Sequence, residues 1–176
     1  MKIKFLLSDI PILAARYLEE SRPVDVDLEK EIENIIAPNV RKRGYFAKGE
    51  FQSLCYWKTP RARPLVESNP EDYIEAVTRT SLATPSERLR IEVLTLLRGV
   101  SWPTASVVLH WAHTKPYPIL DFRALWSLGI ETEVDYDFDF WWEYTQFCRA
   151  LAKESGLSMR VLDRALWQYS NEHQGK

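Results

Sequence analysis

The chain of 176 residues has few cysteines, no long apolar run and little net charge, and each shortage excludes a class of protein. Its two cysteines, Cys55 and Cys148, cannot make a four-cysteine zinc or iron–sulfur site. No apolar run approaches the ~18 residues of a membrane span. A formal net charge of −2 argues against a chain built as a polycation for nucleic acid. What remains is an ordinary globular composition, 45% hydrophobic and 27% charged, long enough to bury a core.

The N-terminus and the cysteines indicate the expected compartment. The first 20 residues hold a short apolar patch that no small-residue cleavage site follows, so we expect a helix of the mature protein rather than a signal peptide. With nothing pointing to secretion, both thiols are expected to be free and buried in a reducing cytoplasm, although a disulfide between them stays open. We therefore expect a cytoplasmic protein that is not associated with a membrane.

Charge is distributed unevenly along the chain, and this segmentation is more informative than its sum. Residues 41–63 hold seven Lys or Arg and one Glu. Residues 19–34 hold seven acids and two bases, and residues 131–139 hold five acids and no base. A basic segment beside acidic ones fits DNA binding on one side only, and it fits ordinary solvated faces equally well.

Helical periodicity runs through the sequence and predicts an all-α fold in a single compact domain over residues 1–176. Apolar residues recur at helical spacing in the predicted segments, as in Ile10, Leu13, Ala14 and Tyr17, or in Leu162, Ala165, Leu166 and Tyr169. Pro38 is expected to end or kink one helix, and residues 59–64 (TPRARP) are expected to form a loop. Residues 133–140 alternate in polarity but lead straight into a helical pattern, so no strand is predicted.

Several residues are typical of helix ends and give the expected boundaries. Asn69 followed by Pro70 is expected to start one helix. Asp137 or Asp139 is expected to cap a later one, and Ser158 the last. These signals divide the chain into short helices joined by tight turns.

The most informative stretch is residues 94–129 (LTLLRGVSWPTASVVLHWAHTKPYPILDFRALWSLG), because two helices there are joined by a very short turn. One helix ends at LRGVS and the next begins at once, which predicts a helical hairpin over about residues 87–113. The turn exposes backbone N–H groups at the N-terminus of the second helix, a natural seat for a phosphate. Gly99 would let the backbone approach a ligand closely, and a DNA phosphate would fit without sequence preference.

The segment LLRGVSWPTAS resembles the helix-hairpin-helix motif of the DNA-glycosylase superfamily (HhH-GPD) that includes endonuclease III and the adenine glycosylase acting on mismatches. That motif runs Leu-Pro-Gly-Val-Gly, two residues, then Thr-Ala. It is matched here by Leu97, Gly99, Val100, Thr104 and Ala105. The string Pro118-Ile119-Leu120-Asp121 is similar to the adenine-glycosylase branch. The resemblance is strongest over residues 47–129, and the two unmatched ends are expected to supply a second helical lobe.

The resemblance implies that Asp121 is catalytic, and the chain departs from the family pattern in several places. Lyase members have a catalytic Lys before the Thr of the motif, 18 positions ahead of the Asp, where this chain has Pro103. Without that amine no Schiff base forms, so strand cleavage by β-elimination is not expected. The second Gly of the hairpin is Ser101, which tolerates close phosphate approach less well, and the iron–sulfur cysteines of endonuclease III are absent.

A weaker match lies upstream, in FQSLCYWKT (51–59). This segment resembles in position and outline the family helix that ends in Leu-Ser-Gln-Gln-Thr, from which a side chain enters the gap left by a flipped base. Trp57 and Lys58 would then lie at the base-probing loop, although Trp57 is as readily explained as core or rim. The expected DNA-binding residues are Gly99, Val100, Ser101, Thr104, Trp57, Lys58, Arg61 and Arg63.

The implied chemistry requires a carboxylate beside the sugar. Breaking an N-glycosidic bond builds positive charge on the sugar, and a carboxylate stabilises that charge or activates a water. An Asp at a helix start serves equally well as an N-cap, so both roles of Asp121 stay open. His110 and His113 have no further ligand at suitable spacing, so no metal is expected. The resemblance allows only a monovalent cation on hairpin carbonyls around Leu97 and Gly99.

Three functions stay open at this point. The first is a monofunctional DNA glycosylase that hydrolyses the bond to a damaged, mismatched or modified base in double-stranded DNA. The second is a non-catalytic DNA-binding module on the same fold, which the replacement of glycine by Ser101 and the negative net charge favour. The third is a helical protein-interaction domain, which the acidic segments and the seven Trp residues allow. DNA binding through basic residues would count against the third: Arg41, Lys42, Arg43, Lys58, Arg61 and Arg63.

Overall fold

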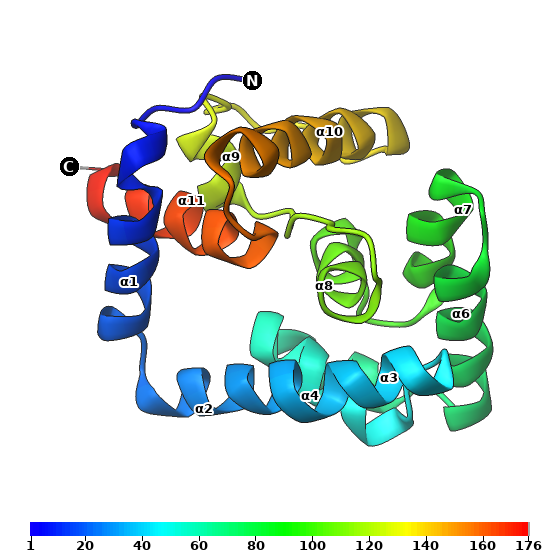
Figure 1. The fold of residues 1–176 in the computed structure, drawn as a ribbon. Helices are drawn as coiled ribbons and strands as arrows, with labels where there is room; N and C mark the ends of the chain where they lie inside the picture. Colours follow the sequence, from blue (N-terminus) through cyan, green and yellow to red (C-terminus); the bar gives the residue numbers. More distant parts are fainter. Residues whose placement is uncertain (176) are drawn as a thin grey trace. The chain divides into compact units, whose positions relative to one another are not determined.

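The computed structural model describes residues 1–175, and every regular element in that range is a helix or a helical turn (Figure 1). The all-α prediction is therefore confirmed over the described residues, while the specific glycosylase type of fold stays a prediction. Residues 133–137 precede α10 (Phe138–Ser155) without forming a strand. Over the described range no helix is both long and apolar enough to cross a membrane.

The chain divides into two compact units, each described by itself. Unit 1 combines Met1–Ser21 with the chain from Pro116 onward, and unit 2 is Arg22–Lys115. The two chain ends thus meet in one unit, as expected for a second lobe, but residues 22–46 belong to the other unit. The prediction that residues 1–176 form a single domain stays a prediction.

Unit 1 is built around the C-terminal helix. Its elements are η1 (Leu7–Asp9), α1 (Ile10–Glu20), α9 (Phe122–Ser127), α10 and α11 (Met159–His173). Helix α11 packs against α1, α9 and α10, as Figure 1 shows. It buries Leu162, Ala165 and Leu166, because these residues repeat at the helical period. Tyr17 of α1 meets Trp167 of α11 edge to face, with ring centroids 5.4 Å apart.

The first residues of the chain attach to the end of α9. The N–H groups of Lys2 and Lys4 donate to the carbonyls of Leu128 and Ser127, at 2.9 and 3.0 Å. The Lys4 ammonium lies 3.4 Å from the ring centroid of Trp126 and pairs with Glu131 at 2.7 Å. The two backbone hydrogen bonds satisfy carbonyls that the C-terminus of α9 leaves unpaired.

Unit 2 holds the remaining elements: α2 (Pro23–Glu31), η2 (Ile32–Ile36), α3 (Ala37–Arg43), α4 (Lys48–Lys58), η3 (Pro60–Ala62), α5 (Arg63–Glu67), α6 (Glu71–Ala83), α7 (Glu87–Glu92), η4 (Val93–Leu96) and α8 (Trp102–Ala112). Its core includes Phe46 and Phe51, whose rings meet edge to face at 6.1 Å. Helix α8 is apolar almost all round and is buried from Thr104 to Leu109, as a central helix must be.

Two expectations about proline are corrected by the structure. Residues 59–64 are not a loop, because η3 and α5 occupy residues 60–67. Pro60 and Pro64 each stand in the first turn of their element, where the missing N–H costs nothing. Of the two outcomes expected at Pro38, a helix end is wrong, because α3 continues through Pro38 to Arg43, and a kink stays a prediction; the π-helical turn η2 just before it shifts the hydrogen-bond register.

The expected helix ends agree with the structure. Asp137 caps α10 by accepting from Phe140 N–H at 2.8 Å, and Ser158 caps α11. Helix α6 begins directly after Pro70.

Both thiols are free and buried, and burial raises the pKa of Cys55 to about 12. The disulfide that the sequence left open does not form.

Candidate functional site

The predicted hairpin is present in unit 2, as α7 and η4, a turn over residues 97–101, and α8. The turn is closed by Val100 N–H donating to the Leu97 carbonyl at 3.1 Å. Its tight geometry needs Gly99, which adopts φ +81°, a left-handed conformation that disfavours other residues. The cation expected at these carbonyls stays a prediction, and the Leu97 carbonyl already accepts one hydrogen bond.

The start of α8 is the part of the hairpin best suited to a phosphate. Ser101 is exposed at the N-cap position, and its side chain caps no backbone N–H. No acidic residue occupies the first turn, and Pro103 there has no N–H of its own. The helix dipole and the N-terminal N–H groups therefore meet no counter-charge from α8 itself.

Gly99 also joins the hairpin turn to α5. A Cβ placed on Gly99 would lie 2.9 Å from Val66 Cγ2, 3.1 Å from Leu65 Cβ and 3.2 Å from the Val66 backbone nitrogen. The absent side chain is therefore needed for packing against α5. Close contact at this glycine is with the protein itself, which the sequence pattern did not indicate.

Asn69 also fastens this turn, a role that sequence reasoning missed. Its side chain is 1% exposed, accepts from Arg98 N–H at 2.8 Å and donates to the Arg98 carbonyl at 2.9 Å. The amide also donates to the Val66 carbonyl at 3.0 Å. Sequence reasoning used Asn69 only as a helix-start signal, because its partner lies 29 residues away.

The structure distributes the expected hairpin contacts between surface and core. Ser101 is exposed and Gly99 is half-buried. Val100 is buried, and Thr104 is only 2% exposed, so neither side chain is available to a ligand. The Val100 N–H already donates to the Leu97 carbonyl, so a phosphate contact at these two positions would have to use the backbone N–H of Thr104.

Of the upstream residues, Arg61 and Arg63 are carried by η3 and α5, and α5 contacts Gly99 of the turn, whereas Trp57 and Lys58 are carried by α4. Arg61 and Arg63 are exposed, and Arg63 pairs with Glu67 at 2.8 Å. Lys58 and Trp57 are half-buried at the end of α4, and the Trp57 ring meets Trp111 of α8 edge to face at 6.1 Å. The alternative that Trp57 is a rim residue is consistent with this packing.

The basic run at residues 41–43 is partly structural. Arg41 donates to the Trp111 carbonyl at 2.7 Å, close to the C-terminus of α8. Arg43 donates to the Tyr45 carbonyl and pairs with Glu50. Charge that already satisfies a carbonyl or a carboxylate is less available to DNA, so Arg61 is a stronger candidate for phosphate contact than Arg41, Arg43 or the Glu67-paired Arg63.

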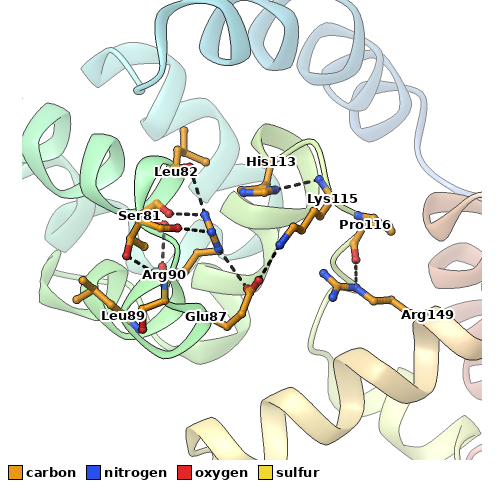
Figure 2. A network of polar contacts seen from close by, with 11 residues as sticks. Ser81, Leu82, Glu87, Leu89, Arg90, His113, Lys115, Pro116 and Arg149 are labelled. Carbon is orange, nitrogen blue, oxygen red and sulfur yellow. Dashed lines mark hydrogen bonds and ion pairs between the residues drawn. The ribbon is translucent and has the colours of Figure 1, made fainter.

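A buried arginine supports the first helix of the hairpin (Figure 2). Arg90 of α7 is 4% exposed and donates to the carbonyls of Ser81 and Leu82 at 2.9 and 3.2 Å. It pairs with Glu87 at 3.2 Å, and Glu87 in turn pairs with Lys115 at 3.1 Å. The guanidinium thus caps the C-terminal carbonyls of α6, where a cation is favourable.

Asp121 lies in unit 1 and is the N-cap of α9. Its Oδ1 accepts from Arg123 N–H at 2.9 Å, and the side chain is half-buried. Tyr136 is a neighbour: burial raises the pKa of its hydroxyl, and the negative charge of Asp121 raises it further. The predicted N-cap geometry is confirmed, and it leaves the catalytic role as a prediction.

A groove of about 640 Å³ lies beside α9. Phe122, Trp126 and Tyr136 line it with aromatic surface, and Phe122 is 60% exposed. The loop between α9 and α10 adds carboxylates to the lining, from Glu131, Glu133 and Asp135. Such a groove suits an aromatic ring and repels a phosphate.

The two histidines considered as a metal pair have other contacts. His113 Nδ1 accepts from Lys115 N–H at 2.9 Å, and the His110 ring meets Trp111 edge to face at 5.1 Å. Among residues 1–175, no group of three or more His, Cys, Asp or Glu side chains is placed to hold a metal ion.

Comparison with known proteins adds no relative: no family model, curated protein or solved structure matches this chain. The function is therefore inferred from the residues of the two units alone.

Proposed function

We propose that this chain is a monofunctional DNA glycosylase, which hydrolyses the N-glycosidic bond of a damaged, mismatched or modified base. The observation that carries the proposal is the start of α8: an exposed Ser101 N-cap without a side-chain cap, directly after a left-handed turn at Gly99. A DNA phosphate would accept hydrogen bonds from the N–H groups there, and the exposed Arg61, just before α5, would add counter-charge.

Asp121 is the proposed catalytic residue. The hydrogen bond from Arg123 N–H fixes the orientation of its carboxylate, as electrostatic stabilisation of a developing cation requires. A sugar placed against the Asp121 carboxylate would gain that stabilisation as its glycosidic bond breaks. Pro103 supplies no amine, so the product would be an abasic site with an intact strand.

The test is base release from a panel of duplexes that carry uracil, alkylated purines, 8-oxoguanine and its adenine mispair. We expect a strand break that appears only after alkali treatment. Asp121→Asn should lower the rate by about 100-fold or more. Asp137→Asn is the matched control, because Asp137 is likewise a helix N-cap that accepts a backbone N–H, and it should retain the wild-type rate. Equal rates in the two variants would contradict the mechanism.

The hairpin is tested separately by placing a negative charge at its helix start. Ser101→Asp should weaken duplex binding by about 10-fold at low salt, because the carboxylate repels the phosphate. Ser86→Asp is the control, since Ser86 is an exposed serine N-cap in the same unit. Duplex binding that Ser101→Asp leaves unchanged would exclude the start of α8 as the phosphate site.

One observation favours a second candidate, the non-catalytic DNA-binding module. The groove beside α9 is rimmed by Glu131, Glu133 and Asp135, and these carboxylates oppose the approach of a DNA strand to Asp121. This candidate predicts duplex binding that Ser101→Asp weakens, with no abasic product from any duplex. An abasic product that depends on Asp121 would exclude it.

A further inference from the structure

The segment that leads to Asp121 has no regular secondary structure. Residues 116–120 form neither helix nor strand, although Tyr117 to Leu120 are buried. A buried backbone without regular structure needs other partners for its N–H and carbonyl groups, and side chains can supply them. Helices α10 and α11 supply these side chains, all within unit 1.

The first contacts hold the start of the segment. Arg149 Nε donates to the Pro116 carbonyl at 2.7 Å, as Figure 2 shows. The Tyr117 ring stacks on Trp141, with centroids 5.8 Å apart and planes 13° from parallel. Arg149 also lies 4.6 Å from the centroid of the Tyr117 ring. One end of the segment is therefore fixed to α10.

The decisive contacts are at Ile119, two residues before Asp121. The Tyr144 hydroxyl of α10 donates to the Ile119 carbonyl at 2.7 Å. Asp163 Oδ1 of α11 accepts from Ile119 N–H at 3.2 Å. Both side chains are buried, Tyr144 fully and Asp163 to 5% exposure. Together they satisfy both backbone groups of one residue, as two neighbouring strands would in a sheet.

Asp163 occupies a position where packing alone favours an apolar residue. It lies beside Met159, Leu162 and Leu166 on the inward face of α11. A buried carboxylate is costly unless it is hydrogen-bonded, so its presence indicates a specific task. Burial raises the pKa of Tyr144 well above its usual value, and nearby negative charges raise it further. The hydroxyl therefore stays a donor across the ordinary pH range.

We infer that Tyr144 and Asp163 are positioning residues, which clamp Ile119 and so hold Asp121 at the start of α9. The catalytic consequence rests on the proposed function. Freed from the clamp, the segment would shift, and the Asp121 carboxylate would lose its hydrogen bond from Arg123 N–H. A misplacement of about 1 Å costs a catalytic group on the order of 100-fold in rate.

The test compares Tyr144→Phe with Thr145→Val. The first change removes only the hydroxyl that reaches Ile119. The second removes the neighbouring Thr145 hydroxyl, which is buried and has no hydrogen-bond partner among the described residues. We expect Tyr144→Phe to lower kcat by about 10- to 100-fold with KM unchanged, and Thr145→Val to lower neither.

A second readout does not need activity. Amide hydrogen exchange at Arg123 reports whether Asp121 still accepts that N–H. It should become about 10-fold faster in Tyr144→Phe and stay unchanged in Thr145→Val. The Arg123 amide should exchange more slowly in Asp163→Asn, which keeps an acceptor for Ile119 N–H, than in Asp163→Leu, which has none. This second pair decides the question if Tyr144→Phe does not fold.

The outcomes separate the clamp from the proposed function. One outcome is that the Arg123 amide exchanges faster in Tyr144→Phe and Asp163→Leu while the wild-type protein releases no base. This outcome would support the clamp and contradict the glycosylase. A second outcome is that the wild type is active and that Tyr144→Phe and Thr145→Val have the same kcat and the same Arg123 exchange rate. This outcome would overturn the clamp without contradicting the glycosylase. Equal exchange in Asp163→Asn and Asp163→Leu would also overturn it.

Discussion

Replacing Gly99 by alanine is the most direct test of how the hairpin turn is built. The new methyl group would meet Val66 Cγ2 at 2.9 Å and the α5 backbone at 3.2 Å, so it cannot fit without movement. It would also place a Cβ at φ +81°. Gly44 offers a matched control in the same unit, with φ +84° and nothing within 4 Å of the position that its new methyl group would take.

The magnitudes follow from these two geometries. A left-handed conformation costs an alanine about 1–2 kcal/mol, and this term is common to both positions. Forcing a methyl group into a packed contact adds about 1–3 kcal/mol, and this term applies at Gly99 alone. We therefore expect Gly44→Ala to lose about 1–2 kcal/mol of unfolding free energy and Gly99→Ala about 2–5 kcal/mol.

Equilibrium urea unfolding of both variants and the wild type measures the difference. The change in midpoint is interpretable if the slope with denaturant stays constant. Duplex binding should fall for Gly99→Ala, because α5 and the turn move apart, and stay unchanged for Gly44→Ala. Equal losses of stability in the two variants would refute the argument that Gly99 is required for packing.

Three further predictions concern other buried groups. Asn69→Ala should cost about 2–4 kcal/mol of unfolding free energy in urea, because both backbone groups of Arg98 lose their partner. The control Asn34→Ala removes one exposed hydrogen bond and should cost under about 1 kcal/mol. Equal losses would contradict the role of Asn69 in fastening the turn. Arg90→Met should cost about 3–5 kcal/mol because it leaves the carbonyls at the end of α6 without their donor and removes one of the two cations that pair with Glu87, and a loss below about 1 kcal/mol would show that water replaces it. The folded protein keeps the Cys55 proton that the unfolded chain releases above pH 9.0, so the free energy of unfolding should fall with rising pH. Between pH 9 and 10 the wild type should lose about 1 kcal/mol more than Cys55→Ala. Parallel pH curves for the two proteins would exclude the buried thiol as the cause.

Local signals in the sequence predicted the helices and their ends well. Periodicity placed the inward faces of α1 and α11, and the caps at Asp121, Asp137 and Ser158 are where the residue types indicated. These features depend on residues within one or two helical turns of each other, so a single sequence contains them. Proline was misjudged at residues 59–64 for the complementary reason, since a first-turn proline and a loop proline have the same local signature.

Contacts between distant segments could not be predicted in the same way. The bond of Asn69 to Arg98 and that of Asp163 to Ile119 join residues 29 and 44 positions apart. For Asp163 a signal did exist, because a carboxylate on the apolar period of a helix indicates a buried partner. For Gly99 the positive φ was predictable from the turn, whereas its contact with Val66 required the structure.

The division of the chain has a consequence for the order of folding. Unit 2 is continuous, so it can fold as soon as residue 115 has left the ribosome. Unit 1 has to wait for α11, because that helix forms the core against which α1 packs. Its closure joins segments separated by all of unit 2, a costly loop for an open chain. A prefolded unit 2 shortens that loop, so we expect unit 1 to form last during refolding and synthesis.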